Sequence, residues 1–174
     1  MSDKRLESIE ADITTLSLDA IVNAANEALI RGGGVDGAIR RKAGDEMEHE
    51  LRRIGRCRAG NAVITRGGRL PAKFVIHTVA PVFGQSGKTP EEEADLLAAC
   101  YANVLALADK SGIRTVAFPC IGTGIYGWPA DTAAGIAFRV VTQHLRNCTV
   151  QEKIVFCCFS NADRERYARL IAEA

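Results

Sequence analysis

The sequence predicts an α/β fold, a three-layer α/β/α sandwich. Short β-rich runs alternate with longer helical stretches along the whole chain, an order that favours helices on both faces of a sheet. The strand cores are continuously apolar, as in Phe74-Val75-Ile76, which is typical of strands covered on both faces. With 174 residues, 47% of them hydrophobic, the chain is long enough for one buried core, so residues 1–174 are predicted to form a single domain.

Six strands and four helices are predicted from these patterns. The strands cover residues 5–9, 20–23, 61–65, 73–79, 115–119 and 153–159. The helices cover residues 35–54, 90–111, 130–146 and 162–172. The second helix has clear boundaries, because Thr89 precedes Pro90 as an N-cap and Gly112 follows as a C-terminal glycine. The third begins after Pro129, with Asp131 in its first turn.

Composition and charge exclude several classes of protein. The net charge of +1 argues against binding a nucleic-acid backbone, and the arginines of residues 31–69 are interleaved with acidic residues, as on a solvated helix face. No apolar run approaches the roughly 20 residues needed to span a membrane, and no signal peptide is visible. The six cysteines show no CxxC spacing and no zinc-like arrangement with a histidine. We therefore expect a reduced, cytoplasmic protein without a structural metal.

The first candidate ligand loop follows the second predicted strand. Asn23 and Asn26 end this strand, and the run Gly32 to Gly34 then leads into a helix that begins near Asp36. Glycines leave backbone N–H groups uncovered, and the first N–H groups of a helix lack partners and carry a positive partial charge. This combination suits a phosphate, although a flexible turn would also explain three successive glycines.

A second loop of the same character follows the fifth predicted strand. Gly122, Gly124 and Gly127 are spaced two and three apart, with Thr123 between the first two, so the backbone can approach a phosphate closely. An ordinary strand-to-helix turn is the alternative. Neither loop is a Walker A loop, and no catalytic lysine or magnesium-binding acid cluster accompanies them. Because both loops follow the C-terminal ends of strands, they are predicted to grip a diphosphate from either side.

Five short motifs occur in order along nearly the whole chain. They are Ala11-Asp12-Ile13-Thr14, Ile21-Val22-Asn23-Ala24-Ala25-Asn26, residues 32–37, Ile76-His77-Thr78-Val79 and residues 122–127. In these motifs the sequence resembles the macrodomain family, specifically its bacterial and mitochondrial branch that processes ADP-ribose. The resemblance implies a mixed, mostly parallel sheet between helices, with an ADP-ribose cleft across its rim.

The resemblance also implies roles for individual residues. Asp12 would bind the adenine amino group, with the Ile13 backbone beside it. Asn26 would fix the distal ribose, with Asn23 close by, and Asp36 would act at the reacting end. The backbone that would line the diphosphate comes from Gly33, Gly34, Val35, Gly122, Thr123, Gly124, Ile125 and Tyr126. An aromatic side chain that packs on adenine is assigned to Phe159, with Ser160 and Asn161 completing the rim.

Several of these residues have a structural alternative. Asp12 could be a plain N-cap for a short turn, Phe159 could be a core side chain, and Asn23 could brace its loop. His77 lies in an apolar strand and is interpreted as a hydrogen-bonded core histidine rather than a catalyst.

One departure from the family pattern touches the reacting end. Arg40 stands four residues after Asp36, where this branch often has a histidine. Residues at i and i+4 share a helix face, so Arg40 can reach the Asp36 carboxylate or a ligand phosphate. A permanent cation beside Asp36 would make the carboxylate a weaker base for water, which predicts slow turnover.

The leading functional hypothesis is a hydrolase that removes ADP-ribose from carboxylate esters. Its substrates would be O-acetyl-ADP-ribose or mono-ADP-ribosylated acidic side chains of proteins, and no cofactor or metal is expected. Asp36 would activate water, Asn26 would fix the ribose, and Tyr126 would close over it. The alternatives are a reader module that binds ADP-ribose without turnover, and an adaptor for RNA or poly(ADP-ribose), for which the sequence lacks a basic groove.

Overall fold

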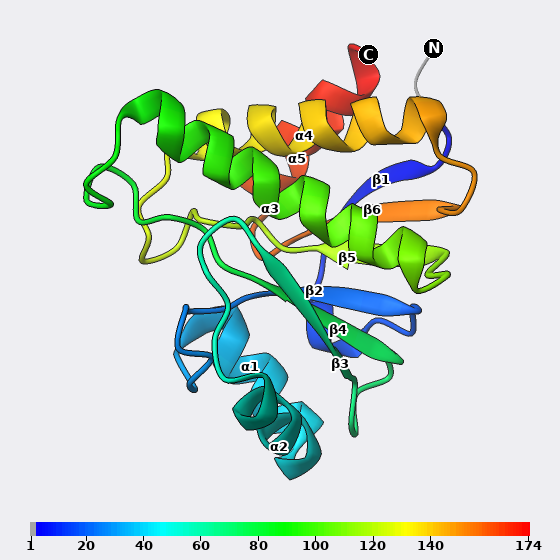
Figure 1. Ribbon diagram of the computed structural model, residues 1–174. Coiled ribbons are helices and arrows are strands. Elements are labelled where there is room, and N and C mark those ends of the chain that lie inside the picture. Colours follow the sequence, from blue (N-terminus) through cyan, green and yellow to red (C-terminus); the bar gives the residue numbers. More distant parts are fainter. Residues whose placement is uncertain (1–2) are drawn as a thin grey trace.

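The computed structural model describes residues 3–174 and contains a six-stranded sheet with helices on both faces (Figure 1). The elements are β1 (Leu6–Glu10), the 3₁₀-helix η1 (Ile13–Thr15), β2 (Ala20–Ala24), α1 (Gly34–Ala43), α2 (Asp45–Ile54), β3 (Ala62–Arg66), β4 (Phe74–Thr78), α3 (Pro90–Lys110), β5 (Thr115–Phe118), α4 (Ala130–Asn147), β6 (Lys153–Cys158) and α5 (Asn161–Ala172). The strand order is β1-β6-β5-β2-β4-β3. Neighbouring strands are parallel except for the pair of β3 and β4. The predicted α/β/α sandwich with a mixed, mostly parallel sheet is confirmed.

Alternate residues of each inner strand pack against opposite helical layers. On β2, Ala20 and Val22 belong to the core beneath α3, α4 and α5, whereas Ile21 belongs to the core shared with α1 and α2. Figure 1 shows the first group of helices above the sheet and the second group below it. The continuously apolar strand cores in the sequence therefore reflect burial on both faces.

The predicted helix over residues 35–54 is wrong, because two helices occupy this stretch. α1 ends at Ala43 and α2 begins at Asp45, with Gly44 between them at φ 89°, a conformation that favours glycine. The Arg69 N–H donates to the Ala43 carbonyl at 3.0 Å, so a neighbouring loop satisfies a carbonyl that the broken helix leaves free. The acidic residues at the start of α2 then lie at the positive end of a helix dipole of their own.

The boundaries of the other predicted elements differ from the structure by one residue at most. Thr89 caps α3 as expected and forms a reciprocal capping box with Glu92, and Gly112 follows the helix at φ 66°. Within residues 3–174, no helix is both long and apolar enough to cross a membrane.

The carboxyl ends of β1, β6, β5 and β2 lie at one edge of the sheet, because these neighbouring strands are parallel. Each is followed by one of the segments that the sequence singles out: η1 after β1, Phe159 after β6, and the two glycine loops after β5 and β2. This edge is where open α/β sheets bind ligands.

Candidate functional site

A cavity of about 660 Å³ opens at this edge of the sheet, between the two glycine loops. Its volume is in the range of small-molecule sites. The predicted site residues that line it are Asp12, Ile13, Asn26, Gly33, Gly34, Val35, Asp36, Gly122, Thr123, Gly124, Ile125, Tyr126 and Phe159. Of the predicted set, Asn23 does not line the cavity, nor do Ser160 and Asn161 of the expected rim.

The first glycine loop is held in shape by the side chains at its two ends. Asn26 accepts a hydrogen bond from the Ile30 N–H at 3.1 Å and donates to the Ile30 carbonyl at 2.7 Å. Asp36 Oδ2 accepts from the Gly32 N–H at 2.7 Å. Gly34 adopts φ 55° at the start of α1, where backbone N–H groups lack intrahelical partners. The loop therefore leads into a helix N-terminus without a side-chain cap, an arrangement that suits an anion.

The second loop requires glycine at one position and tolerates side chains at another. Gly122 has φ 86°, and a Cβ there would lie 2.7 Å from the Trp128 ring, which is itself fixed by a bond to the Pro81 carbonyl. Gly124 is exposed, and a Cβ there would meet nothing within 4 Å. The Thr123 hydroxyl donates its proton to the Cys120 carbonyl at 2.9 Å, so toward any further group its oxygen can only accept.

Asp36 is 4% exposed, and protein donors surround its carboxylate. Oδ1 accepts from Asn23 Nδ2 at 2.8 Å and from Arg40 Nε at 3.0 Å, and Oδ2 accepts from the Gly32 N–H. A carboxylate has about four acceptor positions, two on each oxygen. One acceptor position on Oδ2 is therefore left without a donor from the described residues.

Arg40 lies behind Asp36 and is fully buried, so it does not face a ligand phosphate. Besides Asp36, its guanidinium donates to Glu48 Oε2 and to the Leu29 carbonyl, each at 3.0 Å. The sequence allowed Arg40 to contact either the Asp36 carboxylate or a ligand phosphate, and in the structure it contacts Asp36. Arg40 thus fixes the orientation of Asp36 from the protein side of the site.

His77 and Asn23 continue this buried network away from the cavity. Asn23 Nδ2 lies 3.0 Å from His77 Nδ1, and because an amide nitrogen only donates, Nδ1 accepts. The His77 proton is then on Nε2, which donates to Thr65 Oγ1 at 2.9 Å. Burial, with Arg40 nearby, lowers the pKa of His77 to about 3 and keeps the ring neutral. The core-histidine interpretation is supported, and Asn23 braces Asp36 from below.

Asp12 is an N-cap and a cavity residue at the same time. Its Oδ1 accepts from the Thr14 N–H at 3.0 Å and from the Thr14 hydroxyl at 2.6 Å, and Oδ2 lies 3.5 Å from Lys42 Nζ. The hydrogen bonds from Thr14 and the Lys42 charge hold the pKa of Asp12 below its usual value against the opposing effect of burial. The N-cap role of Asp12 therefore does not exclude a contact between Asp12 and a ligand in the cavity.

Two large apolar side chains stand exposed beside the cavity. Phe159 is 93% exposed and Ile125 is 95% exposed, although both are cavity-lining residues. The alternative that places Phe159 in the core is wrong, because Phe118 and Phe156 fill the core instead. Tyr126 is half-buried in the cavity wall, and burial, with the Glu27 and Asp36 charges, raises its pKa. An aromatic ring that stands free at a rim can stack on a ligand base.

Some residues of the site were not predicted from the sequence. Arg41, Cys120, Cys157 and Asp163 also line the cavity, and Glu48 and Thr65 complete the network behind Asp36. Arg41 directly follows Arg40 in the sequence, but nothing there distinguishes it from the other arginines of α1. A second hollow of about 590 Å³, between β3 and α3, is more open and contains none of the predicted residues.

Known proteins resemble this chain along almost its whole length. The Macro domain family model matches residues 22–137. A Macro domain-containing protein of Ralstonia nicotianae is 53% identical over 169 residues, which cover 97% of this chain and 95% of that protein. An O-acetyl-ADP-ribose deacetylase of Salmonella newport is 46% identical over 173 residues, and the match covers 97% of this chain and 95% of that protein. The solved structure of the Oceanobacillus iheyensis macrodomain with ADP has a TM-score of 0.92 and 36% identity, and the match covers 99% of this chain and 95% of that one. The chain belongs to the Macro domain family.

Proposed function

We propose that this chain, as one macrodomain over residues 1–174, binds ADP-ribose and hydrolyses its carboxylate esters. The observation that carries the proposal is the position of Asp36, whose buried carboxylate forms part of the cavity wall where the first glycine loop joins α1. The relatives support the choice of ligand, since one is named as an O-acetyl-ADP-ribose deacetylase and a solved neighbour holds ADP. The substrates are O-acetyl-ADP-ribose and proteins that carry ADP-ribose on acidic side chains.

The strand order supports one orientation of the ligand. Asp12 and Phe159 follow the adjacent strands β1 and β6, so the adenine lies at that end of the cavity. Asn26 and Asp36 lie after β2, two strands beyond β6, which is about 10 Å away at the usual strand spacing. The distal ribose and the ester lie at that end. The loop after β5 lies between the two ends, where its backbone lines the diphosphate.

The chemistry uses a water molecule on the free acceptor position of Asp36 Oδ2. The water oxygen attacks the ester carbonyl, and its proton passes to Asp36 or to the bound diphosphate. The bond between the carbonyl carbon and the ribose oxygen then breaks, the ribose oxygen takes up a proton, and the acid and ADP-ribose are released. Asn26 fixes the ribose and Tyr126 restricts the access of bulk water. This mechanism assigns no role to a metal or cofactor.

A reader module without turnover is the second candidate, and the environment of Arg40 favours it. The buried guanidinium donates to Asp36 Oδ1, so one oxygen of this carboxylate is engaged with a permanent cation of the protein and is not available to a water molecule. For this reason we propose a slow hydrolase.

All six cysteines are free, which is consistent with the proposed cytoplasmic location.

Free ADP-ribose is expected to bind with micromolar affinity and to raise the melting temperature by mass action. ATP is expected to bind much more weakly, because it carries no distal ribose for Asn26 to contact. Isothermal titration calorimetry with both nucleotides on the same preparation measures the difference. Equal or tighter binding of ATP would contradict the proposed ligand.

Substitution of Asp12 by alanine is expected to weaken ADP-ribose binding by about 1–3 kcal/mol, the cost of leaving a buried polar group of the ligand unpaired. Inhibition of hydrolysis by ribose-5-phosphate is expected to stay unchanged, since this compound lacks the adenine. Calorimetry measures the ADP-ribose affinity, and an inhibition assay measures the effect of ribose-5-phosphate. A melting curve checks whether loss of the η1 cap has unfolded the protein. Normal ADP-ribose affinity in a folded Asp12→Ala variant would show that Asp12 serves only as a cap.

A further inference from the structure

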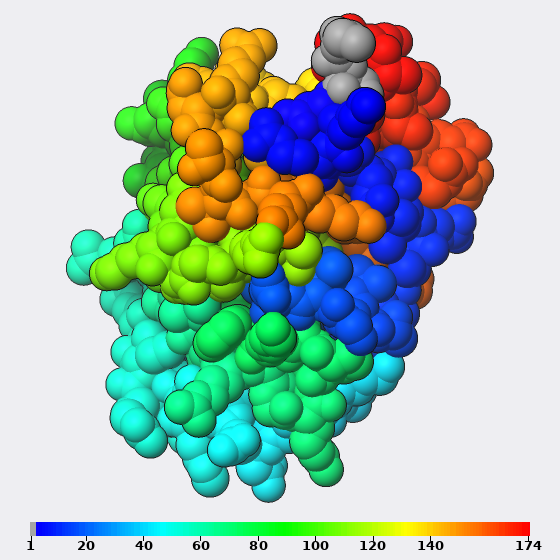
Figure 2. Space-filling model, turned by 90° about the vertical axis from the view of Figure 1, so that its right-hand side faces the viewer, coloured from blue at the N-terminus to red at the C-terminus, as the bar shows by residue number. Residues whose placement is uncertain are grey.

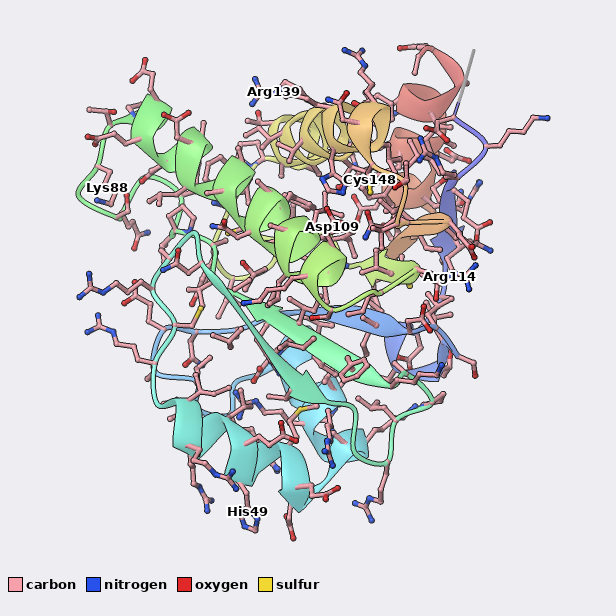
Figure 3. All side chains as sticks on the ribbon, turned by 45° about the vertical axis from the view of Figure 1, so that its right-hand side comes forward. His49, Lys88, Asp109, Arg114, Arg139 and Cys148 are labelled. Atoms are coloured by element: carbon pink, nitrogen blue, oxygen red, sulfur yellow. The ribbon has the colours of Figure 1, made fainter. Side chains whose placement is uncertain are left out.

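A histidine, a cysteine and an aspartate meet at the edge of the sheet opposite to the proposed ADP-ribose site. Their ligand atoms, one each from Asp109, His144 and Cys148, all lie within 4.8 Å of one another. His144 Nε2 and Cys148 Sγ are each 3.5 Å from Asp109 Oδ1. Asp109 comes from the last turn of α3 and Cys148 from the end of α4 (Figure 3). Sequence spacing showed no zinc-like arrangement of a cysteine with a histidine, but in the structure His144 and Cys148, four residues apart, lie close together, and Asp109 joins them from another helix.

Two of the distances in this cluster fit ligand atoms around one ion. A zinc ion with bonds of about 2.0–2.3 Å has ligand atoms about 3.3–3.7 Å apart at the corners of a tetrahedron, which agrees with the two distances of 3.5 Å. The alternative is a catalytic set of cysteine, histidine and aspartate. In such a set the thiol and the carboxylate contact opposite nitrogens of the imidazole. Here the same nitrogen, Nε2, faces both Asp109 and the amide oxygen of Gln151.

Surrounding groups hold these donors in place. Gln151 is 2% exposed, and its Nε2 donates to the Ile113 carbonyl at 3.1 Å, so its Oε1 points to His144 Nε2 and Cys148 Sγ, at 2.8 Å from each. The Val150 N–H donates to Cys148 Sγ at 3.3 Å and fixes the position of the sulfur. Arg5 donates to the Leu145 and Cys148 carbonyls, at 2.8 and 3.0 Å, and fixes the end of α4. Such an outer shell is typical of metal sites.

We propose that Asp109, His144 and Cys148 bind one zinc ion, with a water molecule as the fourth ligand. The set of one thiolate, one imidazole and one carboxylate selects zinc over magnesium or calcium. Binding releases the thiol proton of Cys148 to solvent, and His144 binds through Nε2 with its proton on Nδ1.

The ion would have a structural role, because it joins the end of α3 to the end of α4. Figure 2 shows this face, where the orange residues before β6 lie against the yellow-green residues before β5 and the blue N-terminal residues. The cluster lies at the amino ends of β5 and β6, whereas the proposed ADP-ribose site lies at their carboxyl ends. The zinc proposal therefore does not depend on the proposed hydrolysis.

The test uses the full chain without an affinity tag, freed of metal by a chelator and then titrated with Zn²⁺ against a chromogenic competitor. One equivalent is expected to bind and to raise the melting temperature, and Mg²⁺ is expected to do neither. Substitution of Cys148 by serine or of His144 by glutamine is expected to weaken zinc binding at least about tenfold. The matched control is His49→Gln, an exposed histidine on α2 at the far end of the molecule, which is expected to bind zinc like the unaltered chain.

Titration with Co²⁺ gives a readout that does not require a variant, because a thiolate ligand produces a charge-transfer band. That band is expected in the unaltered chain and in His49→Gln, and its loss is expected in Cys148→Ser. The proposal is overturned if the unaltered chain shows no thiolate–cobalt band, or if it binds zinc no more tightly than Cys148→Ser and His144→Gln. ADP-ribose binding, measured on every variant, verifies that each is folded.

Discussion

Substitution of Asp36 by alanine is expected to reduce the hydrolysis of O-acetyl-ADP-ribose at least about 100-fold and to leave most of the ADP-ribose affinity. Asp36 lines the cavity, and its carboxylate keeps one acceptor position without a protein donor, since Asn23, Arg40 and Gly32 occupy the other three. The proposed diphosphate contacts come from backbone N–H groups, which the substitution does not remove. Release of ADP-ribose by chromatography and binding by calorimetry measure the two effects separately.

Two further variants distinguish a loss of chemistry from a loss of structure. Asp36→Asn keeps an oxygen for Asn23 and Arg40 but removes the base, and it is expected to be as inactive as Asp36→Ala. Arg40→His is expected to melt at a lower temperature, because Glu48 and the Leu29 carbonyl lose their partner, and to keep or raise the turnover number. Unchanged turnover in Asp36→Ala would remove Asp36 from the mechanism. A collapse of activity in a folded Arg40→His variant would make the arginine a working part of the site.

Substitution of Gly124 by glutamate is expected to abolish ADP-ribose binding in a folded protein. The glutamate would bring a negative charge into the loop that is proposed to line the diphosphate, and at about 4 Å like charges repel by roughly 1 kcal/mol in water and by more in a cavity with a lower effective dielectric constant. The backbone can accept this side chain, since a Cβ at Gly124 meets nothing within 4 Å. Calorimetry measures the loss of binding, and a melting curve verifies the fold.

Gly135→Glu is the matched control for this substitution. Gly135 lies in α4, outside the cavity, and a Cβ there also meets nothing within 4 Å. It adds the same charge and is expected to bind ADP-ribose like the unaltered chain. If a folded Gly124→Glu variant binds as well as this control, the second glycine loop is an ordinary turn.

The fold and the outline of the cavity could be predicted from the sequence because both depend on local patterns. Continuously apolar strands and the capping sequence at Thr89 specify elements within a few residues, and parallel strands bring their following loops to one edge. The break at Gly44 could not be recognised, because the amphipathic pattern continues through it and the loop that stabilises it, at Arg69, is distant in sequence.

Contacts between distant residues account for the other differences. Arg40 could reach either Asp36 or a ligand phosphate, and its direction is set by Glu48 on α2 and the Leu29 carbonyl, which only the break between α1 and α2 brings together. The cluster of Asp109 and His144 depends on how α3 packs against α4, 35 residues apart, which no spacing in the sequence reveals.

The most direct test of the proposed hydrolysis is incubation of the unaltered chain with an excess of O-acetyl-ADP-ribose, with acetate and ADP-ribose quantified over time. The expected result is slow catalytic turnover, in which both products appear in equal amounts, exceed the amount of protein many times, and stay near the uncatalysed level with Asp36→Ala. Intact ester at the end of the incubation, in a protein that binds ADP-ribose by calorimetry, would contradict the hydrolase and leave the reader module.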